Sequence, residues 1–162
     1  MYDEGISRLR SETESFFLTD VLGPEHIILD LQSDSCEEVY MELIARLVPD
    51  SKPEMQQRCL HDILNREKKA STFLGHGVAL PHSLSSGVKR LKAALGLKAH
   101  GLTCGREKIK IFLLCLCPEE QHRRYLHFIY QAANILLMPE NRQGLLQAAS
   151  VEQALEILQS TY

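Results

Sequence analysis

The 162-residue sequence predicts an α/β fold, a three-layer α/β/α sandwich in which a mixed β-sheet lies between two layers of helices. The predicted order of elements is one strand, two helices, several strands and then two or three helices. The most apolar segment, 111–117, has the length of a buried strand and is too short to cross a bilayer as a helix, which takes about 20 residues. A chain of this size buries about 69% of its extended surface, so one hydrophobic core is expected.

The first third of the chain predicts one strand and two helices. Residues 26–31 have strand character and follow Gly23-Pro24, a turn signal. Ser35 and Glu38 match a capping box, so a helix is expected to begin there and to end before Pro49. Its apolar face consists of Val39, Leu43, Ile44 and Leu47. A second start signal at 51–54 predicts another helix that ends near Arg66-Glu67. The inner stripe of this second helix consists of Met55, Cys59, Leu60, Ile63 and Leu64.

The remaining elements are expected to be strands, followed by helices. Residues 71–81 contain two glycines and a proline and predict short extended pieces joined by turns. Strands are expected at 91–97 and 109–117, and a helix at 123–137. The expected inward face of that helix consists of Leu126, Ile129, Ala133 and Leu136. After an interruption at Pro139, Ser150 caps a final helix. Its expected inward residues are Val151, Ala154, Leu155 and Leu158.

Composition excludes several classes of function. The net charge of −3 gives no broad basic field, so nucleic acid is not expected as the main partner. The N-terminus has no basic region followed by an apolar one, so it does not resemble a secretory signal, and direct membrane insertion is not expected. Five cysteines, an odd number, indicate a reduced, cytoplasmic protein. We expect them to be buried small hydrophobes, with Cys115 and Cys117 on opposite faces of a strand.

The segment 65–83 carries the candidate chemistry. A neutral imidazole such as that of His82 is a nucleophile and can carry a covalent group. Pro81 restricts the backbone before it, and the glycines of Gly75-His76-Gly77 leave room for a bound group. A guanidinium such as that of Arg66 suits a phosphoryl group. No His-x(3)-His or Cys-x(2)-Cys pair appears, so neither a metal nor a cofactor is expected.

The string from Arg66-Glu67 through Ser71-Thr72 to Gly-His-Gly-Val-Ala-Leu-Pro-His resembles the type-2 EIIA domain of the bacterial phosphotransferase system. That family includes fructose, mannitol and nitrogen-regulatory (PtsN-like) members. The segments 18–48, 108–136 and 150–158 are similar to other parts of the same domain. We therefore expect a type-2 EIIA-like domain over 17–162 and an N-terminal extension over 1–16.

The resemblance implies a phosphohistidine carrier. Its histidine, His82 in this chain, accepts a phosphoryl group from an HPr-type phosphocarrier protein and passes it to an EIIB partner. Arg66 corresponds to the arginine that helps to bind phosphoryl oxygens, and Glu67 is expected to orient it or to be a surface charge at the helix end. Such a transfer requires in-line placement and stabilised oxygens.

The sequence departs from the family pattern at one position of the later helix. Family members usually carry a second active-site histidine there, where alignment of Leu126 and of residues 131–133 places Tyr125. A tyrosine hydroxyl donates a hydrogen bond but does not become cationic. Of two nearby histidines, His127 is expected to face elsewhere, whereas His76 is either near the phosphoryl site or a loop residue.

Two functions therefore stay open. In the first, the chain is a working phosphocarrier between HPr and EIIB. In the second, it is a regulatory binding module of the nitrogen-regulatory kind, in which phosphorylation of His82 switches the binding of another protein or in which phosphorylation is weak or absent.

Overall fold

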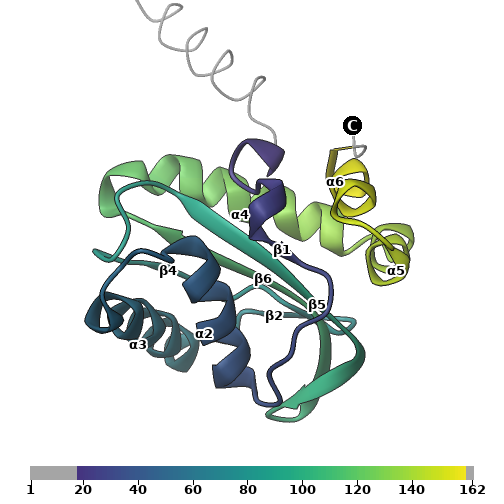
Figure 1. Cartoon of the computed structure of the whole chain (residues 1–162), viewed down its shortest axis with the longest axis horizontal. Helices are drawn as coiled ribbons and strands as arrows, with labels where there is room; N and C mark the ends of the chain where they lie inside the picture. Colours follow the sequence, from purple (N-terminus) through teal and green to yellow (C-terminus); the bar gives the residue numbers. More distant parts are fainter. Residues whose placement is uncertain (1–17, 160–162) are drawn as a thin grey trace, which may run out of the picture.

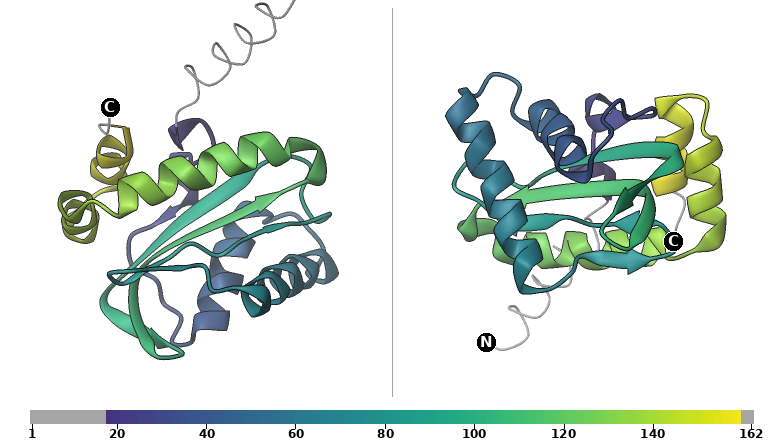
Figure 2. Two further views of the ribbon diagram at one scale, coloured as in Figure 1. Left: turned by 180° about the vertical axis from the view of Figure 1, so that it is seen from behind. Right: turned by 90° about the horizontal axis from the view of Figure 1, so that it is seen from below.

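The computed structural model describes residues 18–159 and shows a β-sheet between two layers of helices (Figures 1 and 2). Helices α2 (Cys36–Leu47) and α3 (Pro53–Lys69) cover one face. Helices α4 (His122–Leu136), α5 (Pro139–Gln147) and α6 (Val151–Gln159) pack on the other face, with α5 and α6 at one end of α4. The short 3₁₀ turns η1 (Leu18–Asp20), η2 (Pro24–His26) and η3 (Glu119–Gln121) connect these elements. The predicted α/β/α fold class is confirmed.

The sheet is mixed and is built around one antiparallel hairpin. Strands β5 (Lys92–Cys104) and β6 (Glu107–Cys117) form its centre, and β1 (Ile27–Ile28) is parallel to β5. On the other edge of β6, β3 (Val78–Ala79) and β4 (His82–Leu84) follow one another, both parallel to β6. Strand β2 (Phe73–Gly75) pairs antiparallel with β3. Because β4 follows this shared edge, His82 lies directly opposite Cys115.

The central hairpin is longer than the sequence analysis predicts. The strand expected at 91–97 continues to Cys104, and its partner begins at Glu107. The additional residues are mostly exposed and polar, so they show no pattern of apolar residues that would predict a strand. They form a strand because they pair with the neighbouring strand of the hairpin. The register shifts between Leu97 and Leu102, where the ladder is irregular.

The N-terminal caps of α2 and α3 agree with the sequence prediction except in two details. The Ser35 hydroxyl accepts a hydrogen bond from the Glu38 amide at 3.2 Å, as a capping box requires. The Glu38 carboxylate accepts from the Asp34 amide rather than from that of Ser35. At the start of α3, Lys52 is the N-cap and no side chain caps the helix, so Pro53 at the first helical position provides the start signal.

The predicted inward face of α4 is confirmed in part: Leu136 is buried and Ile129 and Ala133 pack against the core, but the prediction for Leu126 is wrong. Leu126 is 53% exposed, whereas the buried residues of this helix are Tyr125, Phe128, Ala132, Ile135 and Leu136. Both sets have helical spacing, because α4 carries apolar residues on two sides, and periodicity alone does not select between them. The side of α4 that carries the aromatic rings packs on the sheet, and Tyr125 therefore faces β4.

The prediction that Cys115 and Cys117 lie on opposite sheet faces is also wrong. Both side chains belong to the apolar cluster beneath α4, because residues two apart in a strand point to the same face. The two thiols are free, as are those of Cys36, Cys59 and Cys104. Four of the five cysteines are buried, as the sequence analysis predicts, and Cys36 is partly exposed.

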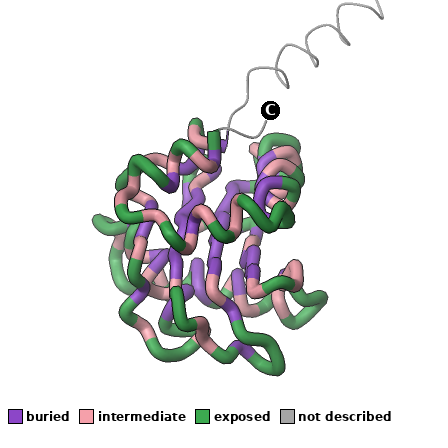
Figure 3. Tube along the Cα trace, turned by 90° about the vertical axis from the view of Figure 1, so that its right-hand side faces the viewer, coloured by how far each residue is buried: buried purple, intermediate pink, exposed green. Residues whose placement is uncertain are grey.

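The sheet separates the apolar interior into two clusters. Phe112, Leu114 and Leu116 face α2 and α3, whereas Leu113, Cys115 and Cys117 face α4. Buried residues accordingly gather in the middle of the molecule (Figure 3). Leu18, the first residue that the structure describes, is buried, with only 3% of its surface exposed. The predicted extension over 1–16 lies outside the described residues. Within residues 18–159 no helix has the length and hydropathy of a membrane span.

Candidate functional site

The site is built on β4, which holds His82 at a fixed place along β6. The Cys115 amide donates to the Pro81 carbonyl at 2.9 Å, and the Ser85 amide donates to the Cys117 carbonyl at 2.8 Å. Hydrogen bonds to β6 therefore secure the backbone on both sides of His82. His82 is partly buried and keeps some exposure to solvent.

The protonation state of the His82 ring is defined by a backbone carbonyl. Nδ1 lies 2.6 Å from the Leu80 carbonyl oxygen, which is an acceptor only, so Nδ1 is the nitrogen that carries the proton. In the neutral ring, Nε2 then holds the lone pair. Burial lowers the pKa of His82, and the Arg66 charge lowers it further, whereas the Leu80 hydrogen bond and Glu67 raise it. The net shift is downward, so at pH 7 the ring is mostly neutral and nucleophilic at Nε2.

Arg66 is placed near the ring by the last turn of α3. Its Nη1 donates to the Ala70 carbonyl at 3.0 Å, where the helix has just ended. The positive charge lowers the pKa of both His82 and Tyr125, so the guanidinium acts on the two rings together. The side chain is partly exposed, and its donors not used by Ala70 are suited to an anion.

Glu67 has a different partner from the one that the sequence analysis expects. Its carboxylate accepts the Thr72 amide at 3.0 and 3.2 Å and also the Thr72 hydroxyl. No ion pair or hydrogen bond between Glu67 and Arg66 occurs within residues 18–159. Glu67 therefore fixes the connection from α3 to β2, and that connection carries the Ala70 carbonyl that holds Arg66.

Replacing Thr72 with valine is expected to lower the free energy of unfolding by about 1.5–3 kcal/mol, the usual worth of a hydrogen bond to a charged group. Thr72 is only 5% exposed, so valine would leave its buried position without the hydroxyl that now bonds to Glu67. Urea denaturation measures the loss. Thr103→Val is the matched control at an exposed position, and an equal loss in both variants would show that the Glu67 bond is not the cause.

Tyr125 on α4 lies beside the His82 ring. The Tyr125 and His82 rings have their centroids 5.7 Å apart at an angle of 56°. Burial raises the pKa of Tyr125, so its hydroxyl remains a neutral donor throughout the physiological range. The ring of His122, a residue that the sequence analysis does not select, lies 6.0 Å from that of Tyr125 at 32°. The available signal for His122 is its i, i+3 spacing from Tyr125 on a helix.

His76 and His127 are not brought to this site. The Gly77 carbonyl beside His76 accepts from Lys110 and Ile111, and β3 pairs with Ile111, whereas His82 pairs with Cys115. Four strand residues separate these two levels, which is about 13 Å. His76 is exposed in the β2–β3 turn with φ of 56°. His127 contacts Gln131 along α4.

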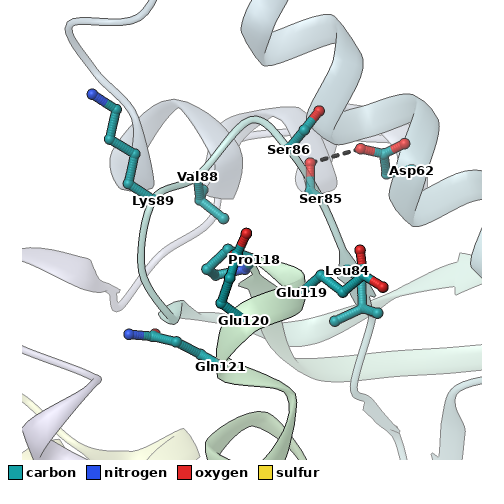
Figure 4. Close-up of a pocket in the computed structure, with 10 residues that line it drawn as sticks. All are labelled: Asp62, Leu84, Ser85, Ser86, Val88, Lys89, Pro118, Glu119, Glu120 and Gln121. Carbon is teal, nitrogen blue, oxygen red and sulfur yellow. Dashed lines mark hydrogen bonds between the residues drawn. The ribbon is translucent and has the colours of Figure 1, made fainter.

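An open cleft of about 680 Å³ lies beyond the carboxyl ends of β4 and β6 (Figure 4). It begins two residues after His82, and His82 is not part of its lining. The lining consists of Asp62, Leu84, Ser85, Ser86, Val88, Lys89, Pro118, Glu119, Glu120 and Gln121. The Ser85 hydroxyl donates to Asp62 at 2.6 Å and ties the loop after β4 to α3 (Figure 4). The partly buried imidazole of His82 thus lies outside this cleft.

The fold and these contacts define a class: an α/β/α sandwich domain that presents a surface imidazole with Nδ1 held by a carbonyl and with a guanidinium beside it. The family model described as "Phosphoenolpyruvate-dependent sugar phosphotransferase system, EIIA 2" matches residues 20–161. The chain belongs to this family, as the sequence motif predicts.

Both nitrogen regulatory proteins and sugar-specific EII components are similar to this chain. The nitrogen regulatory protein of Pseudomonas aeruginosa is 30% identical over 87% of this chain and 94% of its own length. The fructose-specific EIIABC component of Bacillus subtilis is 27% identical over 87% of this chain, which spans only 23% of that relative. The crystal structure of the nitrogen regulatory protein IIA-Ntr from Neisseria meningitidis superposes with a TM-score of 0.77 at 24% identity, covering 87% of this chain and 98% of that one.

Proposed function

We propose that the chain is a phosphoryl carrier in which Nε2 of His82 accepts a phosphoryl group from an HPr-type donor. The observation that most directly supports this proposal is the 2.6 Å contact of Nδ1 with the Leu80 carbonyl, because it leaves Nε2 as the nucleophilic nitrogen. The His82 pKa is lowered by burial, which keeps that nitrogen unprotonated at neutral pH. Membership of the EIIA family supports the same role.

The transfer needs no proton movement at His82. Nε2 attacks phosphorus while the P–N bond to the donor histidine breaks, and the donor nitrogen keeps the electron pair of that bond. The proton on Nδ1 stays on Nδ1. The phosphorylated ring carries a positive charge, so its hydrogen bond to the Leu80 carbonyl strengthens as the new bond forms. Arg66 donates to the phosphoryl oxygens, and Tyr125 adds a neutral donor.

The open placement of His82 favours exchange between two proteins over the reaction of a small molecule. The ring is at the surface beside a cleft rather than inside an enclosed cavity. The elements that form the site carry two exposed apolar side chains: Leu84, 38% exposed, two residues along β4, and Leu126, 53% exposed, which follows Tyr125 on α4. Exposed apolar groups around a reactive residue are typical of a docking surface. An EIIB-type acceptor or a regulated protein would bind the same surface; a solved complex of enzyme IIA mannitol with phosphorylated enzyme IIB mannitol from Escherichia coli resembles the chain in fold.

Phosphorylation in a reconstituted mixture tests the proposal. With phosphoenolpyruvate, enzyme I and HPr, the intact protein should gain the mass of one phosphoryl group, and mild acid should remove it because phosphohistidine is acid-labile. Omission of HPr is the control and should leave the mass unchanged. A chain that stays unmodified with its cognate HPr would overturn the carrier function.

The rate of phosphoryl acceptance should stay high to a lower pH than an ordinary histidine allows. Because burial lowers the pKa of His82 below 6.5, Nε2 keeps its lone pair at pH 6.5, and acceptance declines only as the pH falls through the lowered pKa. Single-turnover labelling between pH 5 and 8 measures this. An acid limb centred at or above 6.5, with the donor chemistry shown not to be limiting, would contradict the assignment.

The alternative is a regulatory binding module that is phosphorylated weakly or not at all. The observation that favours it is Tyr125, which supplies no positive charge where the family usually has a second histidine. The 30% identity to a nitrogen regulatory protein over nearly all of that protein supports a regulatory output. Tyr125→His distinguishes the two functions: faster acceptance would show that the position serves transfer, whereas an unlabelled variant would favour binding without phosphorylation.

A further inference from the structure

The five cysteines of the chain, all of which lie within the described residues, differ in their access to solvent. Cys59, Cys104, Cys115 and Cys117 are buried, whereas Cys36 at the start of α2 is partly exposed. Reaction of a cysteine with a dissolved reagent requires access to its sulfur. Cys36 is therefore the thiol that such a reagent reaches first.

Cys36 and Cys104 meet where α2 packs on the sheet. The start of α2 lies beside the free end of the β5–β6 hairpin, where Cys104 is the last residue of β5 (Figure 1). Cys104 belongs to the apolar cluster between the sheet and the α2–α3 layer, and Cys36 packs against the same cluster. The side chains of the two cysteines are in hydrogen-bonding contact. The fold thus brings together two thiols that lie far apart in the sequence.

Tyr40 completes this small cluster. It follows Cys36 by one turn of α2, and its hydroxyl contacts the Cys36 thiol. Burial raises the pKa of Tyr40 and of Cys104, and the contact with Cys36 and the negative charge of Glu67 raise both further. Both groups therefore stay protonated at neutral pH and are donors toward the Cys36 sulfur. Cys36 is the accessible member of the pair, and Cys104 is its sheltered partner.

We propose that Cys36 and Cys104 form a redox-active pair that a peroxide converts to an intramolecular disulfide. The Cys36 thiolate attacks one peroxide oxygen and the O–O bond breaks. The other oxygen takes up a proton and departs as water or an alcohol, which leaves a sulfenic acid on Cys36. The Cys104 sulfur then attacks the Cys36 sulfur, the S–O bond breaks, and the Cys104 proton leaves with the hydroxyl group as water. The two thiols together lose two electrons, and the peroxide is reduced.

The other cysteines do not have this combination of access and a facing thiol. A disulfide forms without backbone rearrangement only where two side chains already face each other. Cys115 and Cys117 are both buried beneath α4, so a dissolved peroxide does not reach either sulfur in the folded chain. Cys59 is buried in the same cluster as Cys104, but its sulfur accepts from the Ser85 hydroxyl at 3.9 Å. Cys59 therefore provides a matched control.

The test treats the full folded chain with hydrogen peroxide and then counts free thiols with N-ethylmaleimide after unfolding. The wild type should lose two of its five thiols, and dithiothreitol should restore both. Peptide mapping by mass spectrometry should find the Cys36 and Cys104 fragments joined with the loss of two hydrogen atoms. Cys59→Ser should form the same link, whereas Cys36→Ser should keep its remaining thiols. Circular dichroism reports the fold of each variant.

Each outcome decides the proposal. A wild-type chain that keeps all five thiols, or that links Cys36 to a second chain, would overturn it. Thiol loss that dithiothreitol does not reverse would also overturn it, because Cys36 would then oxidise past the sulfenic acid before Cys104 attacks. Equal thiol loss in Cys36→Ser and wild type would exclude Cys36 from the pair. None of these outcomes depends on phosphoryl acceptance by His82, so the proposed function is tested separately.

Discussion

Replacing His82 with glutamine is expected to reduce phosphoryl acceptance by at least about a thousandfold, because the only nucleophile of the proposed reaction is lost. Glutamine is close to histidine in size and keeps an amide that can donate to the Leu80 carbonyl. The backbone of β4 is held to β6 independently of the side chain, so the fold should remain intact. Intact-mass spectrometry after the HPr reaction measures the loss, and circular dichroism reports the fold.

His76→Gln is the control for this experiment. The substitution is chemically identical, but His76 lies on the β2–β3 turn, about 13 Å along β6 from the level of His82. Its labelling should equal that of wild type. Full labelling of His82→Gln, or loss of labelling in both variants, would place the acceptor at another residue and contradict the assignment of Nε2.

Replacing Phe112 with alanine is expected to lower the free energy of unfolding by about 3–5 kcal/mol. Phe112 is fully buried in the middle of β6, opposite Gly96, and its ring packs edge-on against Tyr40 of α2 at 6.4 Å and 74°. Its loss would leave a cavity at the junction of the sheet and the α2–α3 layer. Domains of this size are stable by only about 5–15 kcal/mol, so the variant should unfold at much lower urea concentration.

Phe112→Leu is the matched variant. Leucine keeps most of the buried apolar surface and loses the ring contact with Tyr40, so it should cost less than half as much as alanine. Denaturant midpoints with unchanged slopes would give both values. A loss below about 1 kcal/mol for Phe112→Ala would show that the layers close over the gap and that this ring does not anchor the α2–α3 layer.

The elements that could be predicted from the sequence are those that local chemistry defines. The spacing of Val39, Leu43 and Leu47 is visible because only one side of α2 is apolar, and the cap at Ser35 is a contact between near neighbours in the chain. The hairpin beyond Leu97 could not be predicted, because its exposed residues are strand only through pairing with β6. The burial of Tyr125 in place of Leu126 on α4 could not be predicted either, because both residues belong to plausible apolar stripes.

The features of the candidate site also fall into two groups, those that the sequence predicts and those that only the packing of the elements decides. The glycines, Pro81 and His82 form one continuous string, so the sequence by itself determined the family and the candidate nucleophile. Only the tertiary structure decided the partner of Glu67, the distance of His76 from the reactive ring and the contact of His122 with Tyr125. The physical reason differs between them. The Glu67 contact depends on how the chain turns after α3, and the place of His76 depends on how β3 and β4 pair with β6. The contact of His122 depends on how α4 rotates and packs on the sheet. That rotation is selected by long-range burial, which leaves no pattern within a single segment.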